Sequence, residues 1–98
     1  MKQFYMVEFE LLDVFTNDFL NKIPQQQQQI DRMMAKGIIK SYSLSLNRSK
    51  LWLIAGAENE FEVMEIIAQL SLSEFMIPSI MPLMFHNSSQ TVREFSLN

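Results

Sequence analysis

The sequence predicts an α+β domain with a four-stranded antiparallel sheet, in the element order strand, helix, strand, strand, helix, strand. Apolar side chains recur at every second position in residues 3–12 and 38–46, which is the period of a strand, and residues 50–57 carry apolar side chains on both strand faces. Apolar side chains recur at helical spacing after residue 16 and again after residue 59. The 98 residues, 48% of them hydrophobic, suffice for one compact domain and are too apolar for a disordered tail.

The first expected strand, residues 3–12, has two different faces. One face is wholly apolar and is expected to pack on the helices. The other face is half apolar and half acidic, which is unusual for a face turned to solvent. The apolar face carries Tyr5, Val7, Phe9 and Leu11, and the mixed face carries Phe4, Met6, Glu8 and Glu10.

A helix of about twenty residues is expected next. Thr16 or Asn17 can cap its first turn, and Gly37 ends it, because glycine readily adopts the backbone conformation that follows helices. Pro24 lies inside this pattern and lacks the N–H of a helical hydrogen bond. It therefore predicts either a bend or two short abutting helices.

Two glutamines fall on the apolar stripe of this helix. Gln26 and Gln27 lie three or four residues from both Ile23 and Ile30. We expect their methylene stems to cover the edge of the core while the amides reach solvent. The alternative is that an amide lines a pocket.

Residues 38–46 and 50–57 are expected to form an antiparallel hairpin, because only the turn at 47–49 separates them. Trp52 and Ile54 lie on the face opposite the other apolar side chains of the second of these strands. That strand is therefore expected to be covered on both sides and to be central in the sheet.

A capping box begins the second helix, with Asn59 as the cap and Glu62 three positions later. This helix is expected to run to about Leu70. A loop through residues 71–77 then leads to a last strand near residues 79–86.

Pro82 places this last strand at a sheet edge or at a bulge, because proline donates no hydrogen bond to a neighbouring strand. Residues 87–98 are polar and are expected to form a C-terminal arm on a single domain that spans residues 1–98. A known solution for this element order is the ferredoxin-like βαββαβ fold, in which the first and third strands are central.

Two helices can cover only one face of such a sheet. The other face carries Phe4 and Met6, among others, and therefore needs a partner. A second copy of the chain, packed sheet to sheet, is the simplest partner that would cover this face. We expect a homodimer or a larger homo-oligomer, with a small-molecule ligand as a further partner.

Composition excludes several function classes. The chain has no cysteine, so it has no disulfide, no thiolate nucleophile and no Cys-ligated metal. A single histidine, His86, cannot build a multi-histidine metal site within one chain. The net charge of −3 argues against a nucleic-acid partner. Neither a signal peptide nor a bilayer-spanning stretch is visible, so no membrane partner and a cytoplasmic location are expected.

Residues 69–76, Gln-Leu-Ser-Leu-Ser-Glu-Phe-Met, resemble the Gln-Leu-Pro-Leu-x-x-Tyr-Met segment of muconolactone isomerase and its relatives. Residues 83–89, Leu-Met-Phe-His-Asn-Ser-Ser, are similar to that family's Leu-x-x-His-Pro-Ser-Ser. Chain length, element order and the glycine after the first helix are similar too, so the resemblance covers nearly the whole chain. It implies a dimeric α+β barrel, often assembled into larger rings, that uses no cofactor to move a double bond in an unsaturated lactone carrying a carboxylate.

The chain departs from this family pattern at several positions. Phe75, Ile77 and Asn87 stand where the pattern has tyrosine, aspartate and proline. The first strand carries Glu8 and Glu10 where the isomerase has basic groups. The expected fold survives these changes, whereas the exact substrate does not transfer.

Shifting a double bond beside a carbonyl requires a base that removes a proton and returns it elsewhere. A carboxylate in a largely apolar pocket has a raised pKa, which suits this role, and Glu8 and Glu10 share a strand face with Phe4 and Met6. His86 is the third catalytic candidate, because it matches the family's histidine and because pairing of the first and last strands would place it near Phe4 and Met6. The alternative is that the carboxylates are solvated or paired with lysine and that the histidine is a bystander.

Phe4, Met6 and Trp52 are candidates for contact with an apolar substrate, and Arg48 is a candidate for receiving its carboxylate. The first hypothesis is a cofactor-free isomerase acting on an unsaturated lactone or acid. The second is a catalytically silent dimeric barrel that binds a small apolar acid or simply assembles. The third is a cofactor-independent monooxygenase built on the same barrel. The expectation is an isomerase-like protein without a metal site.

Overall fold

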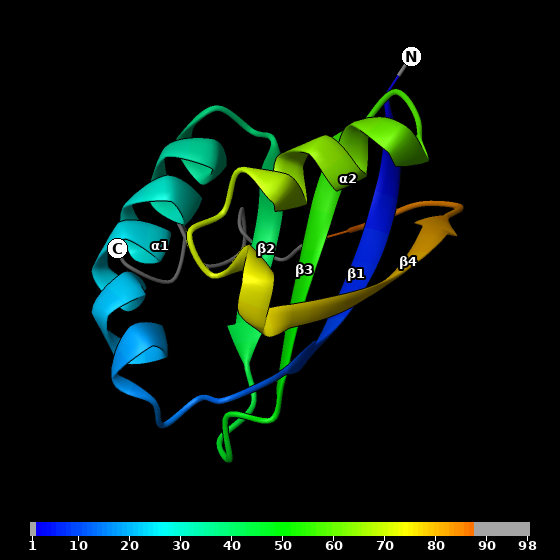
Figure 1. Cartoon of the computed structure of the whole chain (residues 1–98). Helices are drawn as coiled ribbons and strands as arrows, with labels where there is room; N and C mark the ends of the chain where they lie inside the picture. Colours follow the sequence, from blue (N-terminus) through cyan, green and yellow to red (C-terminus); the bar gives the residue numbers. More distant parts are fainter. Residues whose placement is uncertain (1, 88–98) are drawn as a thin grey trace, which may run out of the picture.

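Four antiparallel strands and two α-helices make up the computed structural model, which describes residues 2–87. The predicted ferredoxin-like βαββαβ fold is confirmed (Figure 1). The elements in chain order are β1 (Gln3–Leu11), α1 (Asn17–Ala35), β2 (Ile39–Leu44), β3 (Lys50–Ala57), α2 (Glu60–Ala68), the short 3₁₀ helix η1 (Ser73–Phe75) and β4 (Met76–Leu83).

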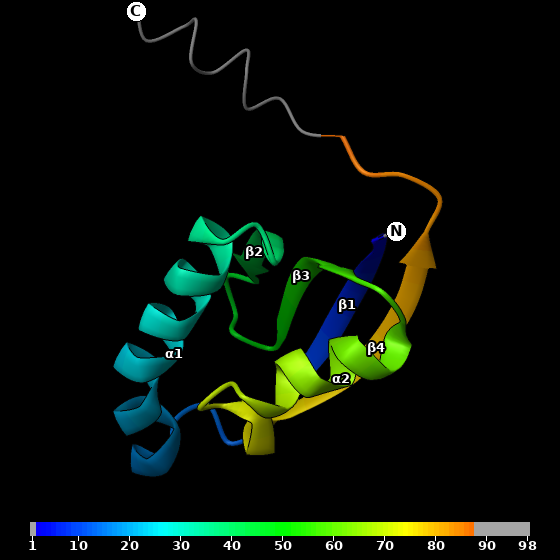
Figure 2. The same cartoon turned by 90° about the horizontal axis from the view of Figure 1, so that it is seen from above.

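The sheet has the strand order β2-β3-β1-β4, so β1 and β3 are central as predicted. Both helices lie on one side of it (Figure 2), with α1 against β2 and α2 against β3. The apolar face of β1 is buried beneath them, and Val7 and Phe9 have no exposed surface. The core continues through the inward side chains of β3 and α2, including Leu53 and Val63. The opposite face of the sheet has no helix of residues 2–87 over it.

Each helix begins at the predicted cap. The Thr16 hydroxyl accepts a hydrogen bond from the Phe19 N–H at 3.3 Å, and the Asn59 side chain accepts one from the Glu62 N–H at 2.9 Å. α1 continues through Pro24 as one element, so the alternative of two abutting helices is wrong. Pro24 lies on the exposed side of α1, where water can hydrate the carbonyl group that a proline leaves without a helical donor.

The last strand differs from its predicted bounds. β4 spans Met76–Leu83, three residues earlier than expected, and it holds both Pro78 and Pro82. The edge position predicted from proline is confirmed, because β1 is the single neighbour of β4 within the described part of the chain. Half of the N–H groups of an edge strand face away from the sheet, so prolines at such positions remove no inter-strand hydrogen bond. His86 consequently lies beyond the strand and not within it.

The predicted C-terminal arm, residues 87–98, lies outside the described part of the chain apart from Asn87. Within residues 2–87, neither helix has the length and hydrophobicity needed to cross a membrane.

Candidate functional site

Five of the predicted site residues lie together on the face of the sheet that the helices leave open. Phe4, Met6, Glu8 and Glu10 alternate along β1, and Trp52 of β3 is the register partner of Glu8. Apolar side chains of the neighbouring strands extend this face. Met6 pairs with Ile54 on one side and with Met81 on the other, and the Met81 side chain is 64% exposed. We call this surface the open face.

Glu8 forms a polar group with two residues of β3. Its carboxylate accepts hydrogen bonds from the Trp52 indole Nε1 and the Lys50 Nζ, each at 3.0 Å. These bonds and the lysine charge hold the pKa of Glu8 below its ordinary value. The shift is opposite to the raised pKa expected of a general base near neutral pH. Glu8 therefore matches the alternative expectation, a carboxylate that is paired with lysine.

His86 does not meet the two glutamates. Its ring lies 6.0 Å from the Phe4 ring at an interplanar angle of 63°, which is an edge-to-face contact, so the predicted proximity to Phe4 is confirmed. Lys40 lies near the same ring, with its Nζ 5.8 Å from the centroid. Glu8 is four residues further along β1, about 13 Å away at strand spacing. The three catalytic candidates thus do not converge on one point.

Arg48 lies on the other side of the molecule, where a cavity of ≈ 390 Å³ opens between α1 and the β2–β3 hairpin. Arg48 is the only charged residue among the described residues that line this cavity. The other lining side chains are apolar, apart from two glutamine amides and one tyrosine hydroxyl: Leu11, Phe19, Ile23, Gln26, Gln27, Tyr42, Leu44, Leu51 and Leu72.

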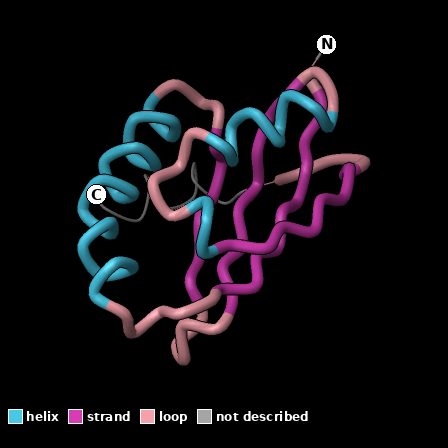
Figure 3. Tube along the Cα trace, viewed as in Figure 1, coloured by secondary structure: helices cyan, strands magenta, loops and turns pink. Residues whose placement is uncertain are grey.

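The hairpin turn holds Arg48 in an uncommon backbone conformation, with φ of 60°. The turn is the loop at the lower end of the sheet in Figure 3. The Arg48 N–H donates to the Ser45 carbonyl at 3.0 Å, and Asn47 Oδ1 accepts from the backbone and the hydroxyl of Ser49 at 3.0 and 2.7 Å. A left-handed backbone costs a residue with a side chain about 1–2 kcal/mol, and glycine or asparagine is common at such positions.

Gln26 is buried at the cavity wall, with 3% of its surface exposed. Its Oε1 accepts a hydrogen bond from the buried Leu72 N–H at 3.1 Å, and its Nε2 donates to the Tyr42 hydroxyl at 3.3 Å. The expectation that its amide reaches solvent is wrong, and the alternative, an amide that lines a pocket, is correct. The helical spacing of Gln26 from Ile23 and Ile30 was the sequence signal for this position.

Tyr42 is the residue of this cavity that the sequence patterns did not select. Burial raises the pKa of its hydroxyl, against a smaller lowering effect of the Gln26 hydrogen bond. The phenol therefore stays protonated at neutral pH. Tyr42 shares a strand face with Leu44, and its contact with Gln26 depends on the tertiary packing of α1 against β2.

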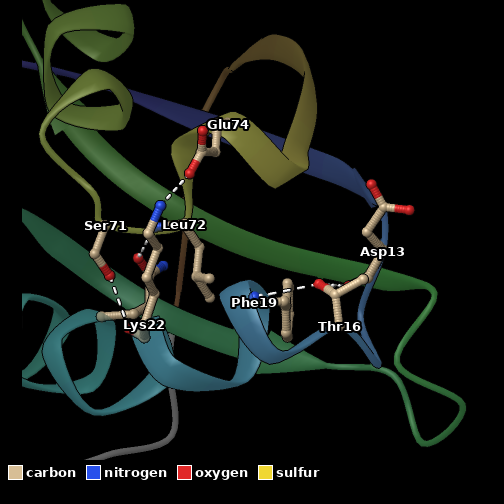
Figure 4. A network of polar contacts seen from close by, with 8 residues as sticks. Asp13, Thr16, Phe19, Lys22, Ser71, Leu72 and Glu74 are labelled. Carbon is tan, nitrogen blue, oxygen red and sulfur yellow. Dashed lines mark hydrogen bonds and ion pairs between the residues drawn. The ribbon is translucent and has the colours of Figure 1, made fainter.

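Polar contacts fix the segment after α2 against α1 and so hold the wall of the cavity (Figure 4). Lys22 forms an ion pair with Glu74, and the Ser71 hydroxyl donates to the Lys22 carbonyl at 2.9 Å. The Ser71 N–H donates to Gln29 Oε1 at 2.7 Å. Leu72, which donates to Gln26, lies within this anchored segment.

Comparison with protein-family models and with curated proteins finds no match to the chain. Within the described residues, no group of three or more His, Cys, Asp or Glu side chains is placed to hold a metal ion.

Proposed function

We propose that the protein binds a small apolar carboxylic acid in the cavity between α1 and the β2–β3 hairpin, with the ligand carboxylate on Arg48. The observation that carries this proposal is an apolar cavity with a single charged lining residue, a cation. Its volume of ≈ 390 Å³ falls at the small end of the range of about 300–1,000 Å³ typical of small-molecule sites.

Arginine suits this role because its planar guanidinium binds a carboxylate through two parallel hydrogen bonds. The backbone supports the same assignment. Arg48 occupies a turn position where glycine would relieve the strained φ, so its side chain is retained at a cost in folding free energy. Such a cost is common at binding sites.

The experiment compares 4-phenylbutanoate with its neutral amide, 4-phenylbutanamide, by isothermal titration calorimetry. The wild-type protein should bind the acid more tightly, and Arg48→Met should weaken acid binding about 10- to 100-fold, the equivalent of 1.5–3 kcal/mol for a charged hydrogen bond. Arg32→Met is the matched control, because Arg32 is exposed on α1 and does not line this cavity. Equal affinity for acid and amide would refute the proposal.

We also propose that two chains pack open face to open face, as the resemblance to the muconolactone isomerase family implies. The support is the apolar character of this face, where Phe4, Met6 and Met81 lie with neither α1 nor α2 over them. Of the two carboxylates on this face, Glu8 is already paired with Lys50 of its own chain, and Glu10 is exposed near the far end of β1. A second sheet can therefore cover the part of this face around Glu8 without leaving that charge unpaired.

Light scattering coupled to size exclusion tests the assembly. The wild type should elute as a dimer or a larger oligomer at micromolar concentration, and Met81→Lys should shift it toward the monomer because it places a charge in the interface. Met64→Lys is the matched control, since Met64 is an exposed methionine of α2, away from the open face. A wild-type monomer at this concentration would contradict the proposal.

The second candidate function is the cofactor-free double-bond isomerase. One observation favours it: Glu8 borders a depression of ≈ 250 Å³ on the open face, beside Met6, Ser79 and Met81, which a second sheet would enclose. Its lowered pKa makes Glu8 a weak base, so this function ranks below binding. Turnover of any member of a panel of unsaturated lactones, slowed at least tenfold by Glu8→Gln, would place it first. No turnover by folded protein would exclude it for that panel.

A further inference from the structure

The hydrogen bonds of Gln26 fix which way its amide faces. The Leu72 backbone N–H is a donor only, so the amide atom 3.1 Å from it must be the oxygen. The amide nitrogen is then the atom that faces Tyr42, and it donates to the phenol oxygen at 3.3 Å. Tyr42 is therefore an acceptor in this bond.

The hydroxyl proton of Tyr42 is thus left to donate elsewhere. Among residues 2–87, no side chain or carbonyl accepts it. Tyr42 lines the same cavity as Arg48 and lies three residues before Ser45, where the turn that carries Arg48 begins. Three residues of strand span about 10 Å, so the cavity offers a cation near the turn and a neutral donor deeper along the hairpin.

We propose that Tyr42 donates a hydrogen bond to a neutral acceptor oxygen of the ligand, so that the preferred ligand is an apolar carboxylic acid that also carries a ketone or a similar oxygen. This inference rests on the proposed acid-binding function and names the ligand class of that site. Burial raises the pKa of Tyr42, which keeps the donor proton in place at neutral pH. A half-buried donor that binds a matched acceptor favours that ligand over an analogue without the acceptor.

The test uses two acids that differ at one position, 4-phenylbutanoate and 4-oxo-4-phenylbutanoate, in which a methylene is replaced by a carbonyl. The measured quantity is the ratio of their dissociation constants by calorimetry. The wild type should prefer the oxo acid by about 3- to 10-fold, the usual range for one neutral hydrogen bond. Tyr42→Phe should reduce this ratio to one or below, because the carbonyl then enters an apolar wall without a donor. If Tyr42 had a purely structural role, Tyr42→Phe would lower the affinity for both acids equally and would leave the ratio of their dissociation constants unchanged.

Gln26→Glu provides a second variant that keeps Tyr42. The introduced carboxylate can still accept a hydrogen bond from the Leu72 N–H. At neutral pH it can also accept a hydrogen bond from the Tyr42 hydroxyl. The oxo preference should disappear although the phenol is present. Gln28→Glu adds the same charge at an exposed position of α1 that does not line this cavity, and it should retain the preference.

The outcomes separate this inference from the function on which it rests. If both acids bind through Arg48 but Tyr42→Phe leaves the ratio at its wild-type value, the Tyr42 inference is overturned and acid binding stands. A wild-type ratio of one also overturns it. If neither acid binds the wild type, the proposed function fails and the inference fails with it.

Discussion

Gln26→Met should destabilise the fold by about 1–3 kcal/mol, because it leaves the buried Leu72 N–H without its acceptor. Methionine has nearly the same volume and helix propensity as glutamine, so the substitution opens no cavity and does not weaken α1 itself. The bond to Tyr42 adds little to this figure, since it is 3.3 Å long and only partly buried. The loss of the amide–Leu72 bond is therefore the main term.

Thermal unfolding followed by circular dichroism measures the effect. A loss of 1 kcal/mol lowers the Tm of a domain of this size by about 4–8 °C, so the expected shift is about 4–24 °C. Gln27→Met is the matched control: its amide is exposed and reaches only Asp31 at 3.3 Å, so its change should stay within about 0.5 kcal/mol. Both variants must be compared at one protein concentration, because association raises the apparent stability. Equal Tm values for the two variants would refute the bridging role of Gln26.

Two further predictions follow from the turn and from the open face. Arg48→Gly should weaken binding of 4-phenylbutanoate at least tenfold. It should leave the urea midpoint of unfolding unchanged or raise it, because relief of the φ of 60° offsets the greater flexibility of glycine in the unfolded chain. A large loss of stability would show that Arg48 is structural. Glu8 has a lowered pKa in the folded state, so its contribution is present above its unfolded pKa and is lost as pH falls below about 4.5 through the folded value. The difference in Tm between wild type and Glu8→Gln should therefore shrink from pH 7 to pH 3. An unchanged difference for Glu8→Gln would contradict the pairing.

Most of the fold could be predicted because each strand and helix carries its own period. Trp52 and Ile54 on the second face of β3 predicted a central strand, and Pro82 predicted an edge strand. The start of β4 could not be predicted, because Pro78 and Pro82 interrupt the signals that separate a loop from a strand. Its position depends on Met76 pairing with Leu11, which is a contact between distant parts of the chain.

The site was predictable only where a strand places it. Alternation along β1 put Glu8 on a face with Phe4, and the structure has the same arrangement. The pKa of Glu8 depends on which β3 residues lie beside it, and that register cannot be read from either strand alone. Tyr42 and Gln26 meet only because α1 packs against β2, so the second polar feature of the cavity needed the tertiary structure.

The two faces of the sheet differ in how their charges are balanced. On the open face Glu8 is paired with Lys50 of its own chain, so a second sheet that covers Glu8 would leave this ion pair intact. In the cavity Arg48 has no carboxylate partner among residues 2–87, so an anionic ligand meets a cation that is not already neutralised. The proposed assembly and the proposed ligand binding would therefore use opposite sides of the sheet and separate sets of residues. Changes at Met81 should alter the oligomeric state without changing acid affinity, and changes at Arg48 should do the reverse, since distant and independent sites act additively.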